Sequence, residues 1–361
     1  MKYFILIPIL SWIFLPFSAP AQPAMQDTPN GPIPVLAYYY IWYNQNSWGR
    51  AKTDYPSLGQ YTSNDAEVIR QHIQWAQAAG IQGFIVSWKN TDFLSENLRV
   101  LIKISEELNF KLVIIYQGLD FERKPLPVDI IGEDLDYFIN NFAQSPVFNL
   151  FEKPVVIWSG SWEFNPTDIA EVTQKRRSDL LILASEKNEK NYLRVADLFD
   201  GDAYYWSSVN PETYPSYTQK LNQMGETVHA HHGLWIAPAA VGFDARLVGG
   251  TSVVDRKNGE TLREEFNAAY QSSPDAIGLI SWNEFSENTY IEPSQKYGNL
   301  YLKVVADINR VDPPVIESFD SSEPNPNIKV DGTSGRYAAL GGLILLVAAS
   351  TVRLFWHQKE R

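Results

Sequence analysis

The stretch Ala276-Ile-Gly-Leu-Ile-Ser-Trp-Asn-Glu-Phe-Ser-Glu-Asn-Thr-Tyr-Ile-Glu-Pro293 carries both a strand signal and a cluster of acids. It is apolar as far as Ile280 and polar afterwards, which predicts a buried strand that ends where the acids begin. Glu284, Glu287 and Glu292 fall within nine residues, beside aromatic residues. Paired carboxylates next to aromatic rings suit glycosidic bond cleavage, in which one acid protonates the leaving oxygen and the other manages the nucleophile. A solvated acidic loop is the alternative.

Seven further apolar runs precede this strand, and helical patterns separate them. The predicted strands are 34–40, 83–88, 111–116, 154–158, 180–184, 203–206, 234–238 and 276–282. The predicted helices are 65–79, 94–108, 131–143, 167–177, 192–198, 214–230, 262–271 and 301–309. Eight such alternations predict an α/β fold, a (β/α)₈ TIM barrel, over residues 32–312. An open doubly wound sheet would alternate similarly, but no glycine-rich phosphate turn follows any of the strands.

The N-terminus has the features of a secretory signal peptide over residues 1–21. Lys2 supplies a basic start, an apolar middle follows, and Ala19-Pro-Ala21 has the form of a cleavage site. An uncleaved N-terminal anchor is the alternative.

The C-terminus predicts a membrane anchor. Residues 313–336 are rich in Pro, Ser and Asn and form a predicted linker. Residues 337–352 carry no charge, and with Arg353-Leu-Phe-Trp356 the segment 337–356 has a length that spans a bilayer. Residues 357–361 would be a cytoplasmic tail, because Arg353, Lys359 and Arg361 put positive charge after the uncharged stretch. A buried core helix is the alternative for 337–356. We therefore expect a single-pass protein of the cell membrane, anchored by its C-terminal helix, with an extracytoplasmic barrel.

Composition narrows the possible partners. The net charge is -12 and no basic stripe is present, so we expect no nucleic acid partner. The chain has no cysteine, which excludes disulfides and thiolate chemistry. The one N-x-S/T match, Asn165-Pro-Thr167, has proline in the middle and is not a glycosylation acceptor. Both facts favour a bacterial cell surface. No histidine spacing indicates a metal, and no motif indicates a cofactor.

Aromatic and hydrogen-bonding residues gather at the carboxyl ends of the predicted strands, where barrels place their chemistry. They suit a neutral, polyhydroxylated ligand, an oligosaccharide or polysaccharide. Trp42 and Trp88 are predicted sugar platforms, because they lie at or just beyond strand ends. The predicted substrate-binding residues are Tyr40, Trp42, Trp88, Tyr116, Tyr205, Asp244, Arg246 and Asn283.

Several motifs together resemble the group that contains glycoside hydrolase families 99 and 71, over about residues 35–305. The acid-bearing segment is the most specific part, because its three acids keep the spacing of family 99. The motifs are Tyr38-Tyr-Tyr-Ile-Trp-Tyr43, Leu58-Gly-Gln-Tyr61, His72-Ile-Gln-Trp-Ala-Gln-Ala-Ala-Gly-Ile81, Phe84-Ile-Val-Ser-Trp88, Pro238 with Gly242-Phe-Asp244, and Trp282-Asn-Glu-Phe-Ser-Glu-Asn-Thr-Tyr-Ile-Glu-Pro293.

The resemblance implies a catalytic role for two of these acids. Glu284 would take the proton of the sugar 2-hydroxyl, so that O2 displaces the leaving group with net retention. Glu287 would protonate the leaving oxygen and then activate water. Asn283 would bind sugar, whereas Glu292 is predicted to be structural or to support the site. Phe285 and its neighbours depart from the family 99 pattern, which leaves α-mannan and α-1,3-glucan both open as substrates.

Two alternatives to an α-glycoside hydrolase remain. One is a non-catalytic surface barrel that binds carbohydrate, which would need the aromatic residues but not the paired acids. The other is a polysaccharide-assembly factor.

Overall fold

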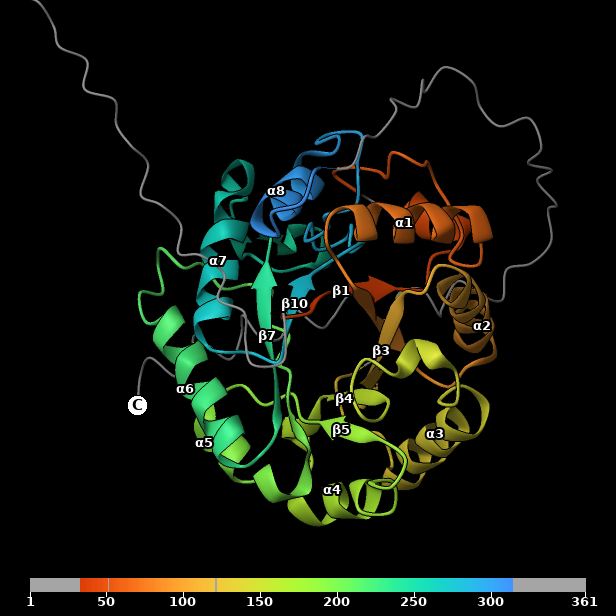
Figure 1. Ribbon diagram of the computed structural model, residues 1–361, viewed down its shortest axis with the longest axis vertical. Coiled ribbons are helices and arrows are strands. Elements are labelled where there is room, and N and C mark those ends of the chain that lie inside the picture. Colours follow the sequence, from red (N-terminus) through yellow and green to blue (C-terminus); the bar gives the residue numbers. More distant parts are fainter. Residues whose placement is uncertain (1–32, 51, 121, 314–361) are drawn as a thin grey trace, which may run out of the picture. The chain divides into compact units, whose positions relative to one another are not determined.

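Eight parallel strands line the centre of the fold (Figure 1). The computed structural model describes residues 33–313 except 51 and 121. Within that part, the strands of the sheet are β1 (Val35–Tyr40), β2 (Gly83–Trp88), β3 (Lys111–Gln117), β4 (Val155–Ser159), β5 (Leu181–Leu183), β6 (Gly201–Asp202), β7 (Leu234–Ala240) and β10 (Ala276–Ile280).

The strands close into a barrel. Their order in the sheet is β5-β4-β3-β2-β1-β10-β7-β6, so the first and last strands of the sequence are neighbours. A parallel bridge between Ala184 and Asp202 joins β5 to β6 and completes the ring. The described residues therefore have the strand arrangement of the predicted (β/α)₈ barrel.

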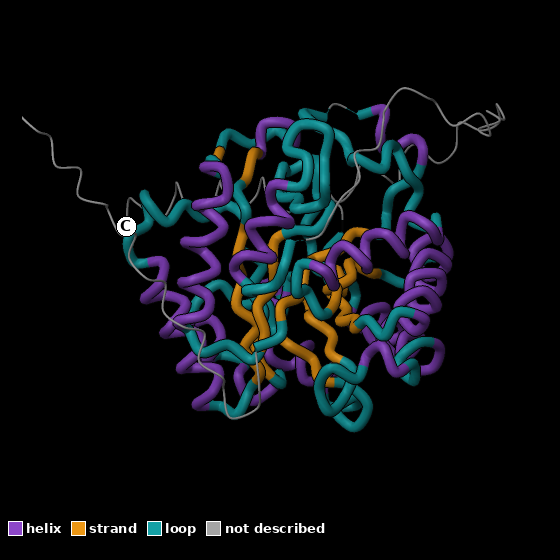
Figure 2. The backbone as a smooth tube through the Cα atoms, turned by 45° about the horizontal axis from the view of Figure 1, so that its top comes forward, coloured by secondary structure: helices purple, strands orange, loops and turns teal. Residues whose placement is uncertain are grey.

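Helices follow the strands and surround them (Figure 2). Polar caps begin several of them: the Asp65 side chain accepts hydrogen bonds from two backbone N–H groups of α1, and the Thr91 hydroxyl accepts one from Leu94 N of α2. The eight α-helices of the described residues are α1 (Ala66–Ala78), α2 (Asp92–Glu107), α3 (Val128–Asn141), α4 (Pro166–Thr173), α5 (Glu189–Leu193), α6 (Tyr217–Ala230), α7 (Glu260–Gln271) and α8 (Leu300–Ile308).

Alternation along each strand divides the core into two parts. In β1, Leu36 and Tyr38 belong to the cluster inside the barrel, whereas Ala37 and Tyr39 belong to the cluster between strands and helices. Because side chains alternate with a period of two, Tyr40 continues the inward row at the carboxyl end of the strand. There it joins a third cluster, made of aromatic residues that cover this end of the barrel.

Two predictions of local structure need correction. The sixth strand was predicted at 203–206, but β6 ends at Asp202, so the aromatic run that follows lies beyond the strand. A short antiparallel pair, β8 (Phe243–Asp244) and β9 (Val253–Val254), lies in the connection from β7 to α7 and was not predicted. Two-residue strands are too short to leave a periodic signal.

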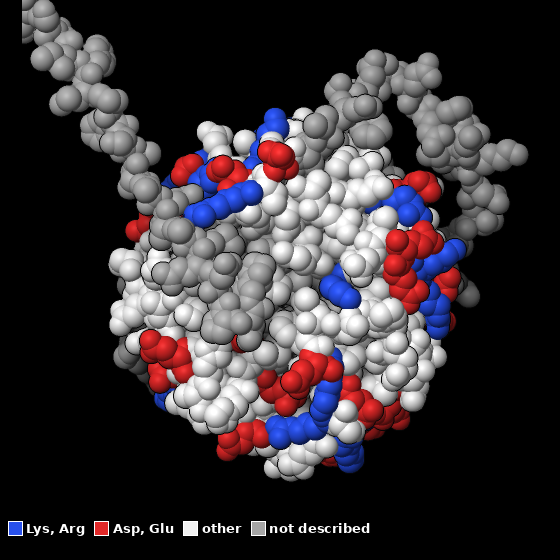
Figure 3. All heavy atoms as spheres, in the orientation of Figure 1, with Lys and Arg blue, Asp and Glu red and all other residues white. Residues whose placement is uncertain are grey.

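The predicted signal peptide, membrane helix and cytoplasmic tail lie outside the described residues, as does the linker after its first residue. Among the residues described, no helix is both long and apolar enough to cross a membrane. On the face drawn in Figure 3, acidic and basic side chains are interspersed around the edge.

Candidate active site

The two predicted catalytic acids lie in one folded turn after β10. Ser281 Oγ accepts a hydrogen bond from Glu284 N at 2.9 Å, and Thr289 N donates to the Glu284 carbonyl at 3.2 Å. The turn places both carboxyl groups out of bulk water, since Glu284 and Glu287 are each only 4% exposed. The structure thus brings together two acids that a solvated acidic loop would have left in water.

Burial gives the two acids unusual proton affinities. It raises the pKa of Glu284 to about 7, against the opposing effects of the Ser286 backbone N–H and the charge of Lys52. Burial also raises the pKa of Glu287, well above the ordinary carboxyl value, and the negative charge of Glu284 adds to this rise. Near neutral pH the pair therefore combines an acid that ionises readily with one that keeps its proton.

Two cations near these acids were missed from the sequence. Burial lowers the pKa of Lys52, while the charge of Glu284 opposes that shift. The positive charge of Arg123 lowers the pKa of Glu287, which partly offsets the rise that burial causes. Arg123 Nε is buried and has no hydrogen bond to any described residue. Both cations lie in loops with no motif around them, so only their distance from the acids in the fold reveals them.

Two of the predicted aromatic residues, Tyr40 and Tyr205, lie beside the acids, and a third, Trp42, packs against Tyr40. Tyr40 donates a hydrogen bond from its hydroxyl to that of Tyr205 at 2.9 Å. Burial and the two glutamates raise the pKa of both tyrosines. Trp42 is half-buried, and its ring lies 4.1 Å from that of Tyr40. An indole that is partly exposed beside Tyr40 can stack on a sugar face.

Asp244 and Arg246 lie at the edge of this site. Asp244 N donates to the Glu287 carbonyl oxygen at 2.8 Å. The Asp244 carboxylate accepts two hydrogen bonds from the Arg246 guanidinium, at 2.8 and 2.6 Å. Because the Arg246 side chain is 68% exposed, we expect it to contact ligand only outside the buried centre.

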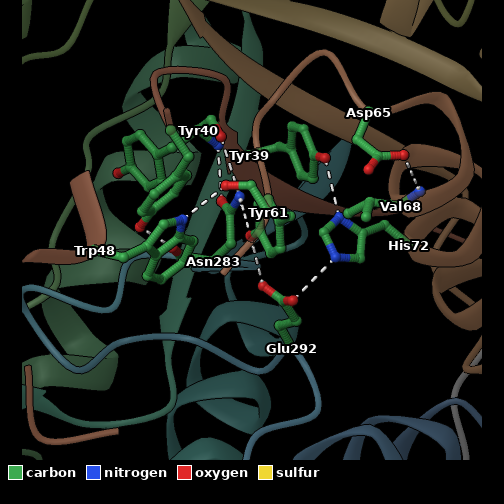
Figure 4. A network of polar contacts seen from close by, with 10 residues as sticks. Tyr39, Tyr40, Trp48, Tyr61, Asp65, Val68, His72, Asn283 and Glu292 are labelled. Carbon is green, nitrogen blue, oxygen red and sulfur yellow. Dashed lines mark hydrogen bonds and ion pairs between the residues drawn. The ribbon is translucent and has the colours of Figure 1, made fainter. Parts of the chain in front are cut away.

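The side chain of Asn283 makes hydrogen bonds to protein groups (Figure 4). Its Oδ1 accepts from Tyr40 N at 2.8 Å, and its Nδ2 donates to Tyr40 O at 3.0 Å and to the Tyr61 hydroxyl at 3.2 Å. The amide thus joins the end of β1 to the segment after β10. With both N–H groups used and the residue fully buried, it has no donor left for a sugar.

Glu292, the third acid of the segment, is tied into a buried chain of polar groups (Figure 4). The Tyr61 hydroxyl donates to Glu292 Oε2 at 2.9 Å, and His72 Nε2 lies 2.9 Å from Oε1. Tyr39 completes the chain, with its hydroxyl 3.0 Å from His72 Nδ1. Both oxygens of Glu292 are therefore occupied, which agrees with the structural role predicted for it.

Trp88 and Tyr116 do not lie with the acids. Both are fully buried in the layer between strands and helices, where Trp88 packs against Phe138 and Phe142. Tyr116 donates to Asp134 at 2.8 Å. The structure does not bring these two predicted residues together with the acids, because they occupy outward positions of β2 and β3, and the inward row of β2 at that end contains Ser87 instead.

The site can therefore donate a proton, accept one, and hold a ring against Trp42. Among the described residues, no three His, Asp or Glu side chains are grouped so that they could hold a metal ion.

Comparison with known proteins places this arrangement in a family. The sequence model of glycosyl hydrolase family 99 matches residues 42–303, more than half of the chain. A glycoprotein endo-alpha-1,2-mannosidase of Mus musculus is 24% identical over 281 residues, which cover 69% of this chain and 59% of that protein. The protein of the same name from Xenopus laevis is 23% identical and covers similar shares, 66% and 58%. The chain thus spans less than two thirds of the length of these relatives.

Solved structures show the same fold. A GH99 endo-alpha-mannosidase from Bacteroides thetaiotaomicron has a TM-score of 0.68 at 22% identity, over 77% of this chain and 97% of that one. A structure described as a glycoside hydrolase-like protein has a TM-score of 0.60 at 17% identity, over 81% and 97% of the two chains. At these identities the likeness concerns the fold alone.

Proposed function

The chain belongs to glycosyl hydrolase family 99, and from that premise we propose that it is a glycoside hydrolase that cleaves α-linked mannan-type glycans. The curated relatives are described as endo-alpha-1,2-mannosidases, which favours mannan over the α-1,3-glucan that the sequence left open. We propose Glu284 as the base and Glu287 as the acid.

One observation carries the proposal: two buried glutamates in one turn have different proton affinities. The pKa of Glu284, about 7, leaves a large fraction of this group ionised near neutral pH. The pKa of Glu287 lies well above the ordinary value, so Glu287 holds the proton that a leaving oxygen needs. These are the protonation states that the resemblance assigns to the two residues.

The reaction would proceed in two steps. Glu284 removes the proton of the sugar 2-hydroxyl, O2 attacks the anomeric carbon, and the leaving oxygen takes the proton of Glu287. Glu287, now a carboxylate, then takes a proton from water; the resulting hydroxide opens the three-membered ring at the anomeric carbon, and O2 recovers its proton from Glu284. Each of the two steps inverts the configuration at the anomeric carbon, so the product keeps the α configuration. Lys52 would stabilise the ionised form of Glu284 that is needed before the first step.

A barrel that only binds carbohydrate fits this site less well. Burying a carboxyl group without an ion-pair partner costs free energy, and a barrel that only binds carbohydrate does not need two such groups side by side. Neither acid is in an ion pair within 4.0 Å among the described residues. An assembly factor without hydrolytic activity has the same difficulty.

The cellular position is also part of the proposal. The basic start and the Ala19-Pro-Ala21 site support export, and the apolar stretch 337–356 followed by positive charge supports a single membrane anchor. We propose an extracytoplasmic enzyme of the bacterial cell membrane. Protease treatment of intact cells tests this: a barrel protected from protease would contradict it.

Digestion of a glycan panel tests the proposed activity. Purified protein would be incubated with α-1,2-linked mannan, other α-mannans and α-1,3-glucan, and the products would be separated by chromatography. We expect cleavage of an α-mannan that Glu287→Gln loses while retaining binding. Binding of glycans without cleavage of any of them would favour the carbohydrate-binding barrel.

A further inference from the structure

The connection from β7 to α7 holds the acid-bearing turn by its backbone. Three carbonyl oxygens of the turn accept hydrogen bonds from this connection. Glu287 O accepts from Asp244 N at 2.8 Å, Asn288 O from Arg256 Nη2 at 2.7 Å, and Tyr290 O from Arg256 Nη1 at 2.8 Å. Two of these bonds come from one side chain, and all three meet the backbone at Glu287 or just after it.

The surroundings of Arg256 are unusual for a buried cation. The residue is only 7% exposed, and no carboxylate lies within ion-pair distance among the described residues. Instead its guanidinium carbon lies 4.3, 4.5 and 5.0 Å from the ring centroids of Tyr290, Tyr301 and Tyr297. Ring faces and carbonyl oxygens together stabilise the charge, and the planar group fixes both carbonyls in one geometry.

A glycine allows Arg256 to take this position. Gly242 has φ +138°, and a Cβ atom there would lie 2.6 Å from Arg256 Cγ. Within the turn, Asn288 has φ 54°, a left-handed conformation that asparagine adopts more readily than most other non-glycine residues. The two bonds from Arg256 hold the carbonyl groups on either side of Thr289.

We propose that Arg256 is a positioning residue: by clamping the carbonyls of Asn288 and Tyr290 it aims the carboxyl group of Glu287 at the leaving oxygen and keeps water away from it. This inference rests on the proposed role of Glu287 as the acid. Arg256 does not touch substrate, so its loss should impair proton donation more than substrate binding.

Leaving-group dependence separates positioning from general stability. In Arg256→Met, kcat on a natural glycosidic bond should fall about 100-fold, near the lower end of what a general acid supplies. With an aryl leaving group that needs no proton, kcat should fall less than about 3-fold. Arg256→Lys should behave as Arg256→Met does, because an ammonium group cannot hold two carbonyls in a fixed fork. Arg263→Met, which removes an arginine paired with Asp307 on the outside of α7, is the matched control and should leave both activities unchanged.

A second readout does not depend on activity. The Glu287 carboxyl group would be titrated by ¹³C NMR in the wild type and in both Arg256 variants. We expect the pKa to fall towards the ordinary value in the variants, as water reaches the group. If Arg256→Met does not fold, Arg256→Lys carries both measurements.

The outcomes separate the two proposals. Equal losses on both substrates, or an unchanged pKa of Glu287, would overturn the positioning role of Arg256. A wild type that cleaves no glycan would overturn the proposed function, while the NMR titration would still decide whether Arg256 controls the environment of Glu287.

Discussion

The pH dependence of the wild-type enzyme should show the raised pKa of Glu284. In the free enzyme this pKa is about 7, and kcat/KM reports ionisations of the free enzyme. Because the base must be ionised, kcat/KM should rise with pH and level off, and the midpoint of this acidic limb should lie near pH 7. One pH unit below that limb, roughly a tenth of the enzyme is active, and two units below it about a hundredth. An ordinary glutamate would place the limb near 4.3 instead.

Removal of Lys52 tests the cause of this limb. The charge of Lys52 lowers the pKa of Glu284, so Lys52→Met should move the limb to higher pH while Lys52→Arg should move it little. Lys175→Met, at an exposed position in the turn just after α4, is the control for loss of one positive charge. Initial rates across pH 4 to 9 (roughly the range in which both forms exist) give the limb for each variant. A limb near the ordinary carboxyl value, or one that Lys52→Met leaves in place, would refute this account of the site.

Three further predictions concern burial and proton transfer. Trp88→Ala should lower the free energy of unfolding by about 3–5 kcal/mol, because Trp88 is fully buried, and should leave glycan affinity unchanged. Trp42→Ala should weaken glycan binding and leave the free energy of unfolding nearly unchanged. Urea denaturation measures the stability of each variant, and isothermal titration calorimetry measures its affinity. Glu287→Gln should recover part of its lost turnover on substrates with activated leaving groups, and Glu284→Gln should not. Recovery of Glu284→Gln alone would reverse the assignment of the two roles, and equal recovery would contradict it. Burial raises the pKa of Glu265 well above the ordinary value, so the unfolded chain releases this proton first and stability falls as pH rises; Glu265→Gln should flatten that dependence in denaturant titrations, and an unchanged slope would contradict it.

Much of the fold could be predicted because each element carries a local signal. Apolar runs marked seven strands to within two residues of their observed bounds. The prediction of β6 was wrong because Gly201 and Asp202 show no apolar pattern, whereas the aromatic run after them does. Parallel neighbours on both sides, not residue preference, make this segment a strand.

The site was predicted less completely, because the direction in which a side chain points and the groups that it contacts depend on the fold. The acids of the turn were found from their spacing, but Trp88 and Tyr116 were chosen although they occupy outward positions. The bonds from Asn283 to the backbone of Tyr40 join two segments that are far apart in the sequence, and no local pattern predicts them. Lys52 is separated from Glu284 by most of the chain, and no local pattern in the sequence shows that the two lie close together in the fold.

The anomeric configuration of the first product tests the central claim most directly. Proton NMR of an α-mannan digest would follow the product before it mutarotates, in the wild type and in the glutamine variants of Glu284 and Glu287. The account predicts an α product first, and loss of nearly all turnover in both variants. A β product would contradict displacement by O2, and full activity in either variant would contradict the assignment of the two glutamates.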